Sequence, residues 1–349
     1  MSNQPLYAHK KVYTFPTRNV EVYFGAENFS IHHWFGDASV FIITDEHIHA
    51  LYPELTRFHP AYIITPGERS KKQSTIDAIL EAMLMAQLGK DVIVLGVGGG
   101  VVSDIAGFVS SIFKRGTRLV LLPTSVLGMV DAALGGKNGI DAGVFKNMIG
   151  TVYQPEKIIY DFTFLKTLPH AEWVNGFAEI IKHGCIKDKE LFEFLEQHTL
   201  ENFQHNMLLA ATLIERNVDL KMNIVTRDEF DQHDRQLLNF GHTIGHALEN
   251  LHELPHGAAI SIGMVAACVL SERLADLHFE EAARLVRLLT QYHLPVDIET
   301  DHDKLFEGIC MDKKRKGEHM QFVLMNTIGS AFAKPVPMKY IQEHLKILI

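Results

Sequence analysis

The chain has 349 residues, of which 47% are hydrophobic and 21% charged, which is the ordinary composition of one or two soluble globular domains. A net charge of −9 argues against nucleic acid or an anionic membrane as partner, although a local basic pocket could still hold a small acidic substrate. Three cysteines without paired spacing, no apolar leader and no apolar run of about 18 residues indicate a cytoplasmic protein without disulfides.

The first half of the chain alternates short apolar runs with helical patterns, which is typical of a parallel α/β sheet. We therefore predict a Rossmann-like α/β domain over residues 1–161. A helix is expected at about 74–88 and another runs from the glycines near 100 to about 114. The expected strands are 20–25, 39–45, 61–67, 92–96, 118–125 and 152–161.

A glycine-rich turn follows the strand at 92–96. Gly98, Gly99 and Gly100 lie between this strand and the next helix, where glycine lets the backbone approach a pyrophosphate and the helix offers free N–H groups. The sequence GVGGG is not the GxGxxG fingerprint, so the alternative is a tight strand-to-helix turn that binds no ligand.

The segment 131–147 combines many glycines with charged and amide side chains. Such a composition predicts a loop that binds a ligand, although a flexible loop with incidental lysines is the plainer alternative. Its polar members are Asp131, Lys137, Asn138, Asp141, Lys146 and Asn147.

Helical periods dominate after residue 161, so we predict a mainly α-helical domain over residues 162–349 that binds a metal and the substrate. A short strand-like run stands at 322–325. The expected helices are 171–184, 188–197, 206–223, 234–251, 257–274 and 279–291.

The predicted helix 234–251 carries an unusual polar stripe. At 100° per residue, its polar members span about 80° of the circumference, and apolar residues cover the opposite side. His242 and His246 have the i, i+4 spacing that lets two imidazoles converge on one ion, and His256 follows after Pro255. Two ordinary surface histidines remain the alternative. The stripe consists of Arg235, Asn239, His242, His246 and Glu249.

Three further charged features have both a functional and a structural interpretation. Glu179 and Lys182 are three residues apart on one helical face, either at a site or as a surface ion pair. Lys221 and the basic run 313–316 add positive charge, although such a run is usually a solvated turn.

Taken together, the chain from about residue 66 to 329 resembles the 3-dehydroquinate synthases, which are members of the sugar phosphate cyclases. The ordered set of motifs is far more specific than any single nucleotide turn. They are PGERSKK (66–72), GGGVVSD (98–104), FKRG (113–116), PTS (123–125), VDAALGGKNGI (130–140), FKN (145–147), FLKTLP (164–169), GFAEIIKHG (176–184), RQLLNFGHTIGHALE (235–249), PHG (255–257) and DKKRKG (312–317).

The resemblance implies a Zn²⁺ or Co²⁺ ion held by Glu179, His242 and His256, whereas His246 matches a residue that faces the substrate. Three protein ligands leave positions open, as a catalytic metal requires. It also implies a homodimer in which Arg115 reaches the neighbouring subunit.

The resemblance further implies NAD and an acidic sugar phosphate as ligands. The NAD set is Glu68, Lys71, Gly100, Val101, Val102, Ser103, Asp104, Thr124, Ser125, Lys137, Lys146, Phe164, Leu165, Lys166 and Thr167. The substrate set is Asp131, Lys137, Asn147, Lys182, Lys221, Arg235, Asn239, His246, Lys313 and Lys314. Lysine and arginine suit a substrate that carries both a phosphate and a carboxylate.

The implied reaction converts 3-deoxy-D-arabino-heptulosonate 7-phosphate to 3-dehydroquinate and phosphate, in the shikimate pathway of aromatic amino acid biosynthesis. Transient oxidation by NAD, phosphate elimination, re-reduction and an intramolecular aldol closure leave no net redox change. The alternatives are a sister cyclase acting on sedoheptulose 7-phosphate or glucose 6-phosphate, a metal-dependent NAD alcohol or glycerol dehydrogenase, and a non-catalytic descendant. The sequence departs from the family pattern at Ala132, Ala133, His233 and Ala258, and at Ser103, Ser125 and Asn138, which puts the NAD and substrate contacts in question.

Overall fold

The computed structural model describes residues 7–27, 29–143, 145–311 and 314–349. By spatial contacts the chain divides into two compact units, and each is described by itself. Unit 1 comprises Met1–Leu168 with Ala210–Phe230, and unit 2 comprises Pro169–Leu209 with Asp231–Ile349. The domain boundary near residue 161 stays a prediction.

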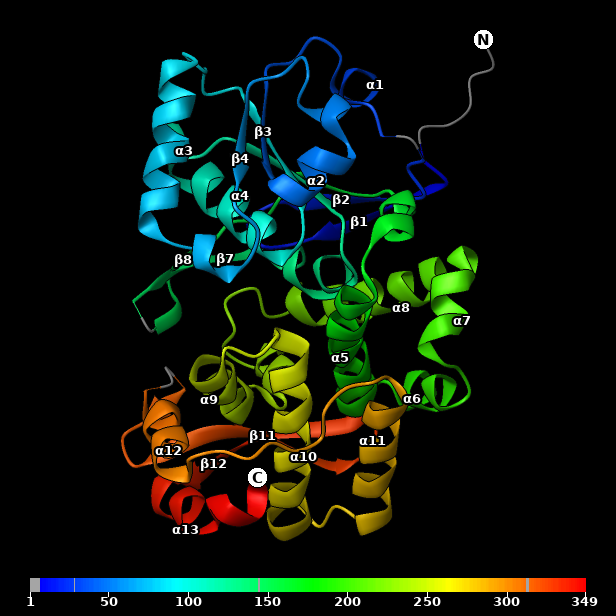
Figure 1. Ribbon diagram of the computed structural model, residues 1–349, viewed down its shortest axis with the longest axis vertical. Coiled ribbons are helices and arrows are strands. Elements are labelled where there is room, and N and C mark those ends of the chain that lie inside the picture. The colour runs from blue at the N-terminus through cyan, green and yellow to red at the C-terminus, as the bar shows by residue number, and fades with distance from the viewer. Residues whose placement is uncertain (1–6, 28, 144, 312–313) are drawn as a thin grey trace. The chain divides into compact units, whose positions relative to one another are not determined.

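Unit 1 is built on a seven-stranded sheet in the order β1-β2-β9-β6-β5-β3-β4 (Figure 1). All neighbouring strands are parallel except β1, which runs antiparallel to β2. The strands are β1 His9–Thr14, β2 Asn19–Phe24, β3 Val40–Asp45, β4 Ala61–Ile64, β5 Ile93–Gly98, β6 Arg118–Pro123 and β9 Lys157–Tyr160. The predicted α/β class is confirmed. The polar edge strand β1 was missed, because lysines and a histidine interrupt its apolar pattern.

The helices of unit 1 cover this sheet and bury its central strands. Every residue of β5 is buried, as is typical of a parallel sheet with helices on its faces. A Cβ added at Gly96 or Gly98 would lie under 3.0 Å from side chains of α4, so these two glycines are needed for helix packing. The helices are α1 Ile31–Phe35, α2 Glu46–Leu51, α3 Gln73–Met85, α4 Gly100–Ile112 and most of α8 Met207–Val225.

The segment predicted as a glycine-rich loop is instead largely a β-hairpin. β7 Lys137–Ala142 pairs antiparallel with β8 Phe145–Val152, and Gly139 stands opposite Gly150. A Cβ on Gly150 would overlap the Asn138 carbonyl oxygen, so the glycines let the two strands approach closely. Glycine and asparagine are rare in strands, which explains why the sequence pattern indicated a loop.

Unit 2 is mainly helical, which confirms the predicted class, but it also contains a three-stranded antiparallel sheet of which only 322–325 was expected. A hydrophobic core of unit 2 joins α9, α10, α12, α13, β11 and β12. The elements are α5 His170–Lys187, α6 Lys189–Glu196, α7 Leu200–His205, α9 His242–His252, α10 His256–Leu274, α11 Phe279–Gln291, α12 His302–Cys310, α13 Met338–Leu348, β10 Arg315–Lys316, β11 His319–Thr327 and β12 Ser330–Pro337.

The single helix predicted over 234–251 is wrong. A 3₁₀ turn covers Asp234–Asn239, and α9 begins only at His242, after Gly241 in the left-handed conformation at φ 78°. Arg235 and Asn239 therefore do not share one helical face with the histidines. The break lies where α10 packs most closely, because a Cβ on Gly241 would lie 2.9 Å from the carbonyl oxygen of Ile260.

Helices α9 and α10 pack so closely that their backbones are in contact. A Cβ on Gly263 would overlap the carbonyl oxygen of Gly241, and a Cβ on Gly245 would lie 3.0 Å from the carbonyl oxygen of Ala259. Gly241, Gly245 and Gly263 therefore allow the backbones of α9 and α10 to approach closely.

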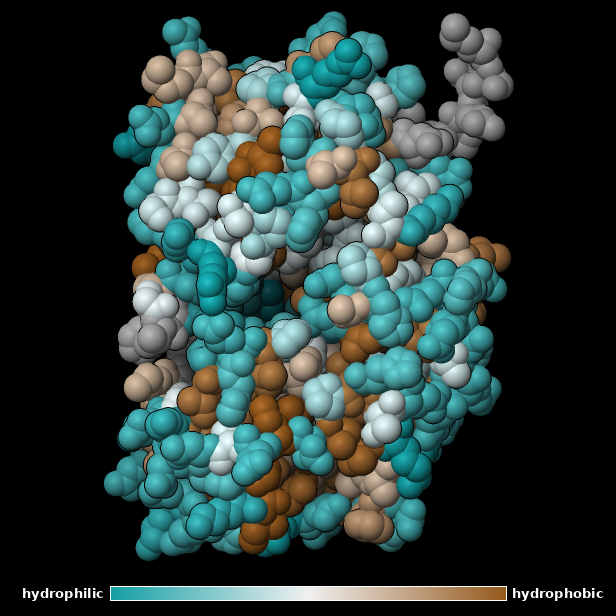
Figure 2. All heavy atoms as spheres, viewed as in Figure 1, coloured by the Kyte–Doolittle hydropathy of each residue, from teal (hydrophilic) through white to brown (hydrophobic). Residues whose placement is uncertain are grey.

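Helix α10 is long and apolar enough to cross a membrane by length and composition alone, with a mean hydropathy of 1.5 over its apolar window. That window is 67% buried inside the protein, as expected for a core helix that is apolar all round. Hydrophobic residues over α10 also reach the surface of unit 2 (Figure 2); Val265 and Val269 are half-buried. The cytoplasmic location stays a prediction.

We expect Gly263→Ala to lower the free energy of unfolding by about 1–3 kcal/mol, because the added methyl group forces α9 away from α10. The same variant should bind less metal, since α9 and α10 carry His242 and His256. Thermal unfolding and metal content would be measured together. Val265→Ala on the same helix is the control and should keep its metal; full metal content and stability in Gly263→Ala would contradict this packing.

Candidate metal centre and nucleotide turn

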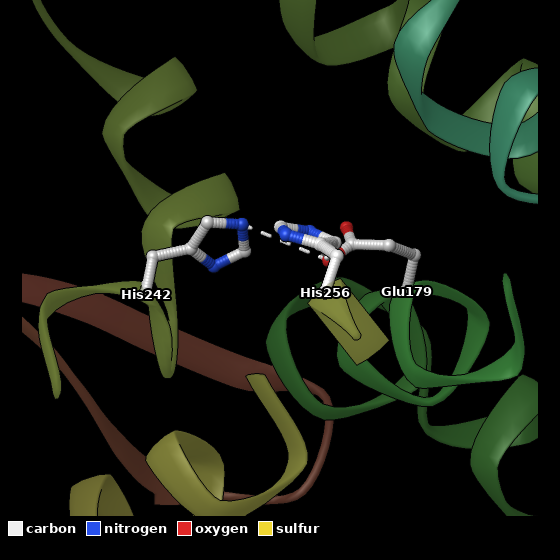
Figure 3. Close-up of side chains that lie close together, drawn as sticks. All are labelled: Glu179, His242 and His256. Atoms are coloured by element: carbon white, nitrogen blue, oxygen red, sulfur yellow. Dashed lines mark ion pairs between the residues drawn. The ribbon is translucent and has the colours of Figure 1, made fainter. Parts of the chain in front are cut away.

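Three side chains of unit 2 converge on one point (Figure 3). Glu179 projects from the middle of α5, while His242 and His256 are the first residues of α9 and α10. Glu179 Oε1 lies 3.7 Å from Nε2 of His242 and 3.5 Å from Nε2 of His256. Their ligand atoms all lie within 4.8 Å of one another. The structure thus brings together the three residues predicted as metal ligands.

The beginning of α10 is anchored beside Glu179. The Gly257 amide donates to Asn175 Oδ1 at 2.6 Å, and Asn175 stands one helical turn before Glu179 on α5. A Cβ on Gly257 would overlap the Asn175 carbonyl oxygen. Glycine after His256 is therefore required, because no other residue lets the two backbones meet there.

Each imidazole is oriented through its other ring nitrogen. Nδ1 of His242 lies 3.0 Å from the carbonyl oxygen of Phe240, and Nδ1 of His256 lies 3.3 Å from Oε2 of Glu249. A carbonyl only accepts, and the charged carboxylate does the same, so both Nδ1 atoms carry a proton. In the neutral form of each ring, Nε2 therefore keeps the lone pair that a metal ion would use. Such outer partners are characteristic of bound metal ions.

The donor set therefore fits a divalent transition metal. Two imidazole nitrogens and one carboxylate are ligands that suit zinc or cobalt and leave coordination positions open. Glu249 lay on the predicted polar stripe, but the sequence assigned it no role. Its role in orienting His256 follows only from the structure.

His246 lies beside the three ligands. Its ring centroid is 5.0 Å from that of His242 and 6.2 Å from that of His256, and with Glu249 and His256 it forms a second group of potential ligands. The two groups share His256. Glu179, which belongs only to the first group, is fully buried, and both Nε2 atoms of His242 and His256 lie within 3.7 Å of its Oε1, which favours the first group.

Burial and neighbouring charge shift the two imidazoles in opposite directions. Burial, reinforced by the cations Lys182 and Lys314, holds the pKa of His242 well below its ordinary value. Burial opposes the charged form of His256 too, but Glu179 and Glu249 outweigh it and raise its pKa to about 10. His242 is thus ready to bind a metal, whereas His256 must first lose a proton.

The remaining predicted substrate residues of unit 2 differ in their surroundings. Lys182 is fully buried and donates to Glu179, so their pair is not a surface ion pair. Arg235 is buried, and Asn239 donates to the Gln236 carbonyl oxygen at 3.1 Å. Lys314 is half-buried, while Lys313 lies outside the described residues.

In unit 1, α4 begins at the glycine-rich turn. Within the described residues no side chain caps the helix at Gly99, so its first N–H groups can bind an anion. The Thr124 amide donates to Gly98 at 2.9 Å, and Ser125 Oγ accepts from Gly128 at 3.1 Å. These contacts hold the turn against the end of β6.

Lys71 connects several predicted NAD residues. Its ammonium contacts Asp104 Oδ2 at 2.7 Å and Glu68 Oε1 at 3.3 Å. Val102 and Ser103 are buried, as are Phe164 and Leu165, whereas Lys166, Thr167, Lys137 and Arg115 are exposed and Lys146, Gly100 and Val101 are half-buried.

A second lysine of unit 1 reaches a predicted substrate residue from α8. Lys221 donates to the Asp131 carboxylate at 2.6 Å and to its carbonyl oxygen at 2.7 Å. Lys221 is buried, so this pair is held in place rather than solvated. The sequence separation between the two residues hid their contact.

Two departures from the family pattern have internal partners. Ser103 Oγ donates to the Gly99 carbonyl oxygen at 3.1 Å. Asn138 donates to the carbonyl oxygens of Gly136 and Tyr153 at 2.7 and 3.0 Å, and a Cβ on Gly107 would overlap its side chain. Asn138 thus closes the base of the β7–β8 hairpin.

Comparison with known proteins agrees with this geometry. Residues 61–175 match the family described as 3-dehydroquinate synthase N-terminal, and residues 176–315 match 3-dehydroquinate synthase C-terminal. A 3-dehydroquinate synthase of Geobacillus thermodenitrificans (strain NG80-2) is 40% identical over 305 residues, which cover 83% of this chain and 82% of that protein.

Solved structures show the same architecture. ValA, a 2-epi-5-epi-valiolone synthase from Streptomyces hygroscopicus subsp. jinggangensis 5008 with NAD⁺ and Zn²⁺ bound, is 27% identical with a TM-score of 0.84 and covers 99% of both chains. A 2-deoxy-scyllo-inosose synthase complexed with carbaglucose-6-phosphate, NAD⁺ and Co²⁺ is 23% identical, has a TM-score of 0.84, and covers 97% of this chain and 100% of that chain; it shows the fold alone.

The fold and the two-imidazole, one-carboxylate group define the class of the sugar phosphate cyclases. Within this class, the chain belongs to the 3-dehydroquinate synthase family. The predicted family is therefore confirmed.

Substituting a metal ligand should empty the centre. We expect Glu179→Ala and His256→Ala to weaken Zn²⁺ binding at least about 100-fold, because an outer partner alone is worth 10–100-fold. Metal content after dialysis would be measured. His246→Ala is the matched control and should keep its metal; a loss as large as in Glu179→Ala would mean that the second group is the metal site.

Metal affinity should rise with pH. Without metal, the raised pKa of His256 adds stability that is complete below about pH 6.5 and is lost as the pH rises to about 10. A metal must displace this proton, so its affinity should increase about tenfold per pH unit between pH 7 and 9. Calorimetry in two buffers would measure proton release, and Glu249→Gln should flatten the slope. A pH-independent affinity would contradict this.

Proposed function

We propose that this chain catalyses the reaction named by its family, the conversion of 3-deoxy-D-arabino-heptulosonate 7-phosphate to 3-dehydroquinate and phosphate. The observation that carries this proposal is the buried Glu179–His242–His256 group with both Nε2 atoms directed at one point. Such a group suits catalysis more than structure, because it leaves positions open for substrate oxygens. The place of the reaction would be aromatic amino acid biosynthesis through the shikimate pathway.

We propose NAD and Zn²⁺ or Co²⁺ as the cofactors, as in the two solved sugar phosphate cyclases. When bound, the metal supplies Lewis acidity toward a substrate hydroxyl group, and NAD supplies a hydride acceptor that returns the hydride within one turnover. Glu179, His242 and His256 would hold the metal, while the free N–H groups at the start of α4 would bind the pyrophosphate of NAD.

The cations of the chain would bind the substrate's negative charges. In unit 2, Arg235 and Lys182 are buried, and a buried guanidinium suits a carboxylate because it can form two parallel hydrogen bonds. In unit 1, the Lys221 ammonium is held by Asp131. These local cations would let a chain of net charge −9 bind an anionic substrate.

We also propose a homodimer in which Arg115 contributes to the neighbouring subunit. The family pattern and the geometry of this residue support the proposal: Arg115 is exposed and lies at φ 62° after Lys114 at φ 46°. Non-glycine residues adopt the left-handed conformation only at a cost, and two in succession mark a strained turn of the kind found at functional sites.

The second candidate is a sister cyclase, which the fold of the solved neighbours favours. The deciding experiment supplies purified, metal-loaded enzyme with NAD and either the heptulosonate phosphate or sedoheptulose 7-phosphate. We expect phosphate release with the first substrate at a kcat/KM at least about 100-fold higher, because Arg235 would otherwise lack its carboxylate partner. NADH should not accumulate. Preference for sedoheptulose 7-phosphate, or net NADH formation as in a dehydrogenase, would overturn the proposal.

A further inference from the structure

The Lys71 ammonium lies at the meeting point of three segments of unit 1. It donates to Asp104 Oδ2 at 2.7 Å and to Asn147 Oδ1 at 2.6 Å, and it lies 3.3 Å from Glu68 Oε1. Only 4% of the residue is exposed. Burial opposes its charge, but the carboxylates of Asp104 and Glu68 outweigh that effect and raise its pKa. Lys71 therefore stays an ammonium at neutral pH.

The same lysine attaches the hairpin to its surroundings through the backbone. The Asp141 amide donates to the Lys71 carbonyl oxygen at 2.7 Å, and the Asp141 carboxylate accepts from the Asn147 amide at 2.8 Å. Asn147 adopts a left-handed conformation at φ 53°. The main chain at Asn147 is thus held by Asp141, and its side chain is held by Lys71.

The contact with Lys71 decides which way the Asn147 carboxamide points. An ammonium can only donate, so the carboxamide oxygen must face Lys71 and the NH₂ group must face away. Asn147 is exposed, so this NH₂ group is accessible to a ligand. It can donate hydrogen bonds to an anionic oxygen, whereas a flipped carboxamide would present an acceptor and repel one.

We infer that Lys71 is a positioning residue for anion binding, which orients Asn147 as a hydrogen-bond donor toward a phosphate oxygen. Because the ammonium also holds Asp104 and Glu68, the residues expected to contact NAD and the residue expected to contact substrate share one cation. This inference rests on the proposed function and on the family resemblance, which implies that Asn147 contacts the substrate and that Lys71 contacts NAD alone. It adds that Lys71 affects substrate affinity even when NAD is saturating.

The first test uses an exposed position, and thermal unfolding checks the fold of the variant, because alanine is less favourable than asparagine at φ 53°. In the full-length, metal-loaded protein with saturating NAD, calorimetry would measure the affinity for inorganic phosphate. We expect Asn147→Ala to weaken phosphate binding about tenfold, because one hydrogen bond to a charged group is lost. The affinity for NAD should change less than about twofold. Unchanged phosphate binding in Asn147→Ala would overturn the inference, whatever the Lys71 variants do.

The second test separates positioning from a direct role of Lys71. Lys71→Gln should weaken phosphate binding about tenfold at saturating NAD, but it should have little further effect in the Asn147→Ala background. Lys71→Arg, which keeps the charge and the donors, should recover part of the loss. If Lys71→Gln binds phosphate as tightly as the wild-type protein once NAD is saturating, Lys71 serves the cofactor only and the inference is overturned. If the losses of phosphate affinity in Lys71→Gln and Asn147→Ala multiply in the double variant, the two residues act independently and the inference is also overturned. Thermal unfolding would identify a variant that fails to fold.

These binding measurements do not require turnover. If the wild-type protein releases no phosphate from the heptulosonate phosphate, the proposed function fails, while the coupling between Lys71 and Asn147 can still be read from phosphate binding. If the wild-type protein turns over but the two residues act independently, only the present inference fails.

Discussion

The backbone contact between α9 and α10 is the constraint on which the metal centre depends. Side chains at Gly241, Gly245 or Gly263 would separate the two helices, and His242 and His256 would move apart with them. Glycine costs about 1 kcal/mol in a helix interior, and close packing compensates this cost at Gly245 and Gly263. The same device recurs at Gly257, whose missing side chain lets α10 begin against α5 beside Glu179.

The ligands are held by a layer of partners that the metal itself does not touch. The Phe240 carbonyl group and the Glu249 carboxylate determine which nitrogen of each histidine is protonated. Because the left-handed Gly241 separates Phe240 from α9, the Phe240 carbonyl group is not part of a regular helix and can accept a hydrogen bond from His242. The end of the helix at Gly241 thus frees the carbonyl group that orients His242. It also places Arg235 and Asn239 in a separate 3₁₀ turn.

Each of the two units contains buried lysines that are paired with carboxylates. Lys182 pairs with Glu179, Lys221 with Asp131, and Lys71 with Asp104. A buried ion pair adds little to stability compared with apolar packing, so such pairs are better understood as preorganised groups for an anionic ligand. Each holds its ammonium in one place before the ligand arrives, which avoids the entropy cost of ordering a long side chain on binding.

The sequence by itself determined the α/β rhythm of the first half, the helical second half and the glycine-rich turn, because apolar periodicity and turn residues are local properties. The order of its motifs indicated the family, and through that resemblance it predicted Glu179, His242 and His256 as the metal ligands. It did not determine the β7–β8 hairpin, since glycine and asparagine obscure the strand pattern, nor the end of the predicted helix at Gly241. Those outcomes depend on neighbours far along the chain, such as α10 beneath Gly241 and Lys71 beside Asn147. Only the tertiary structure showed that the side chains of His242 and His256 meet at Glu179, because neither spacing on one helix nor a resemblance reports how closely two helices approach.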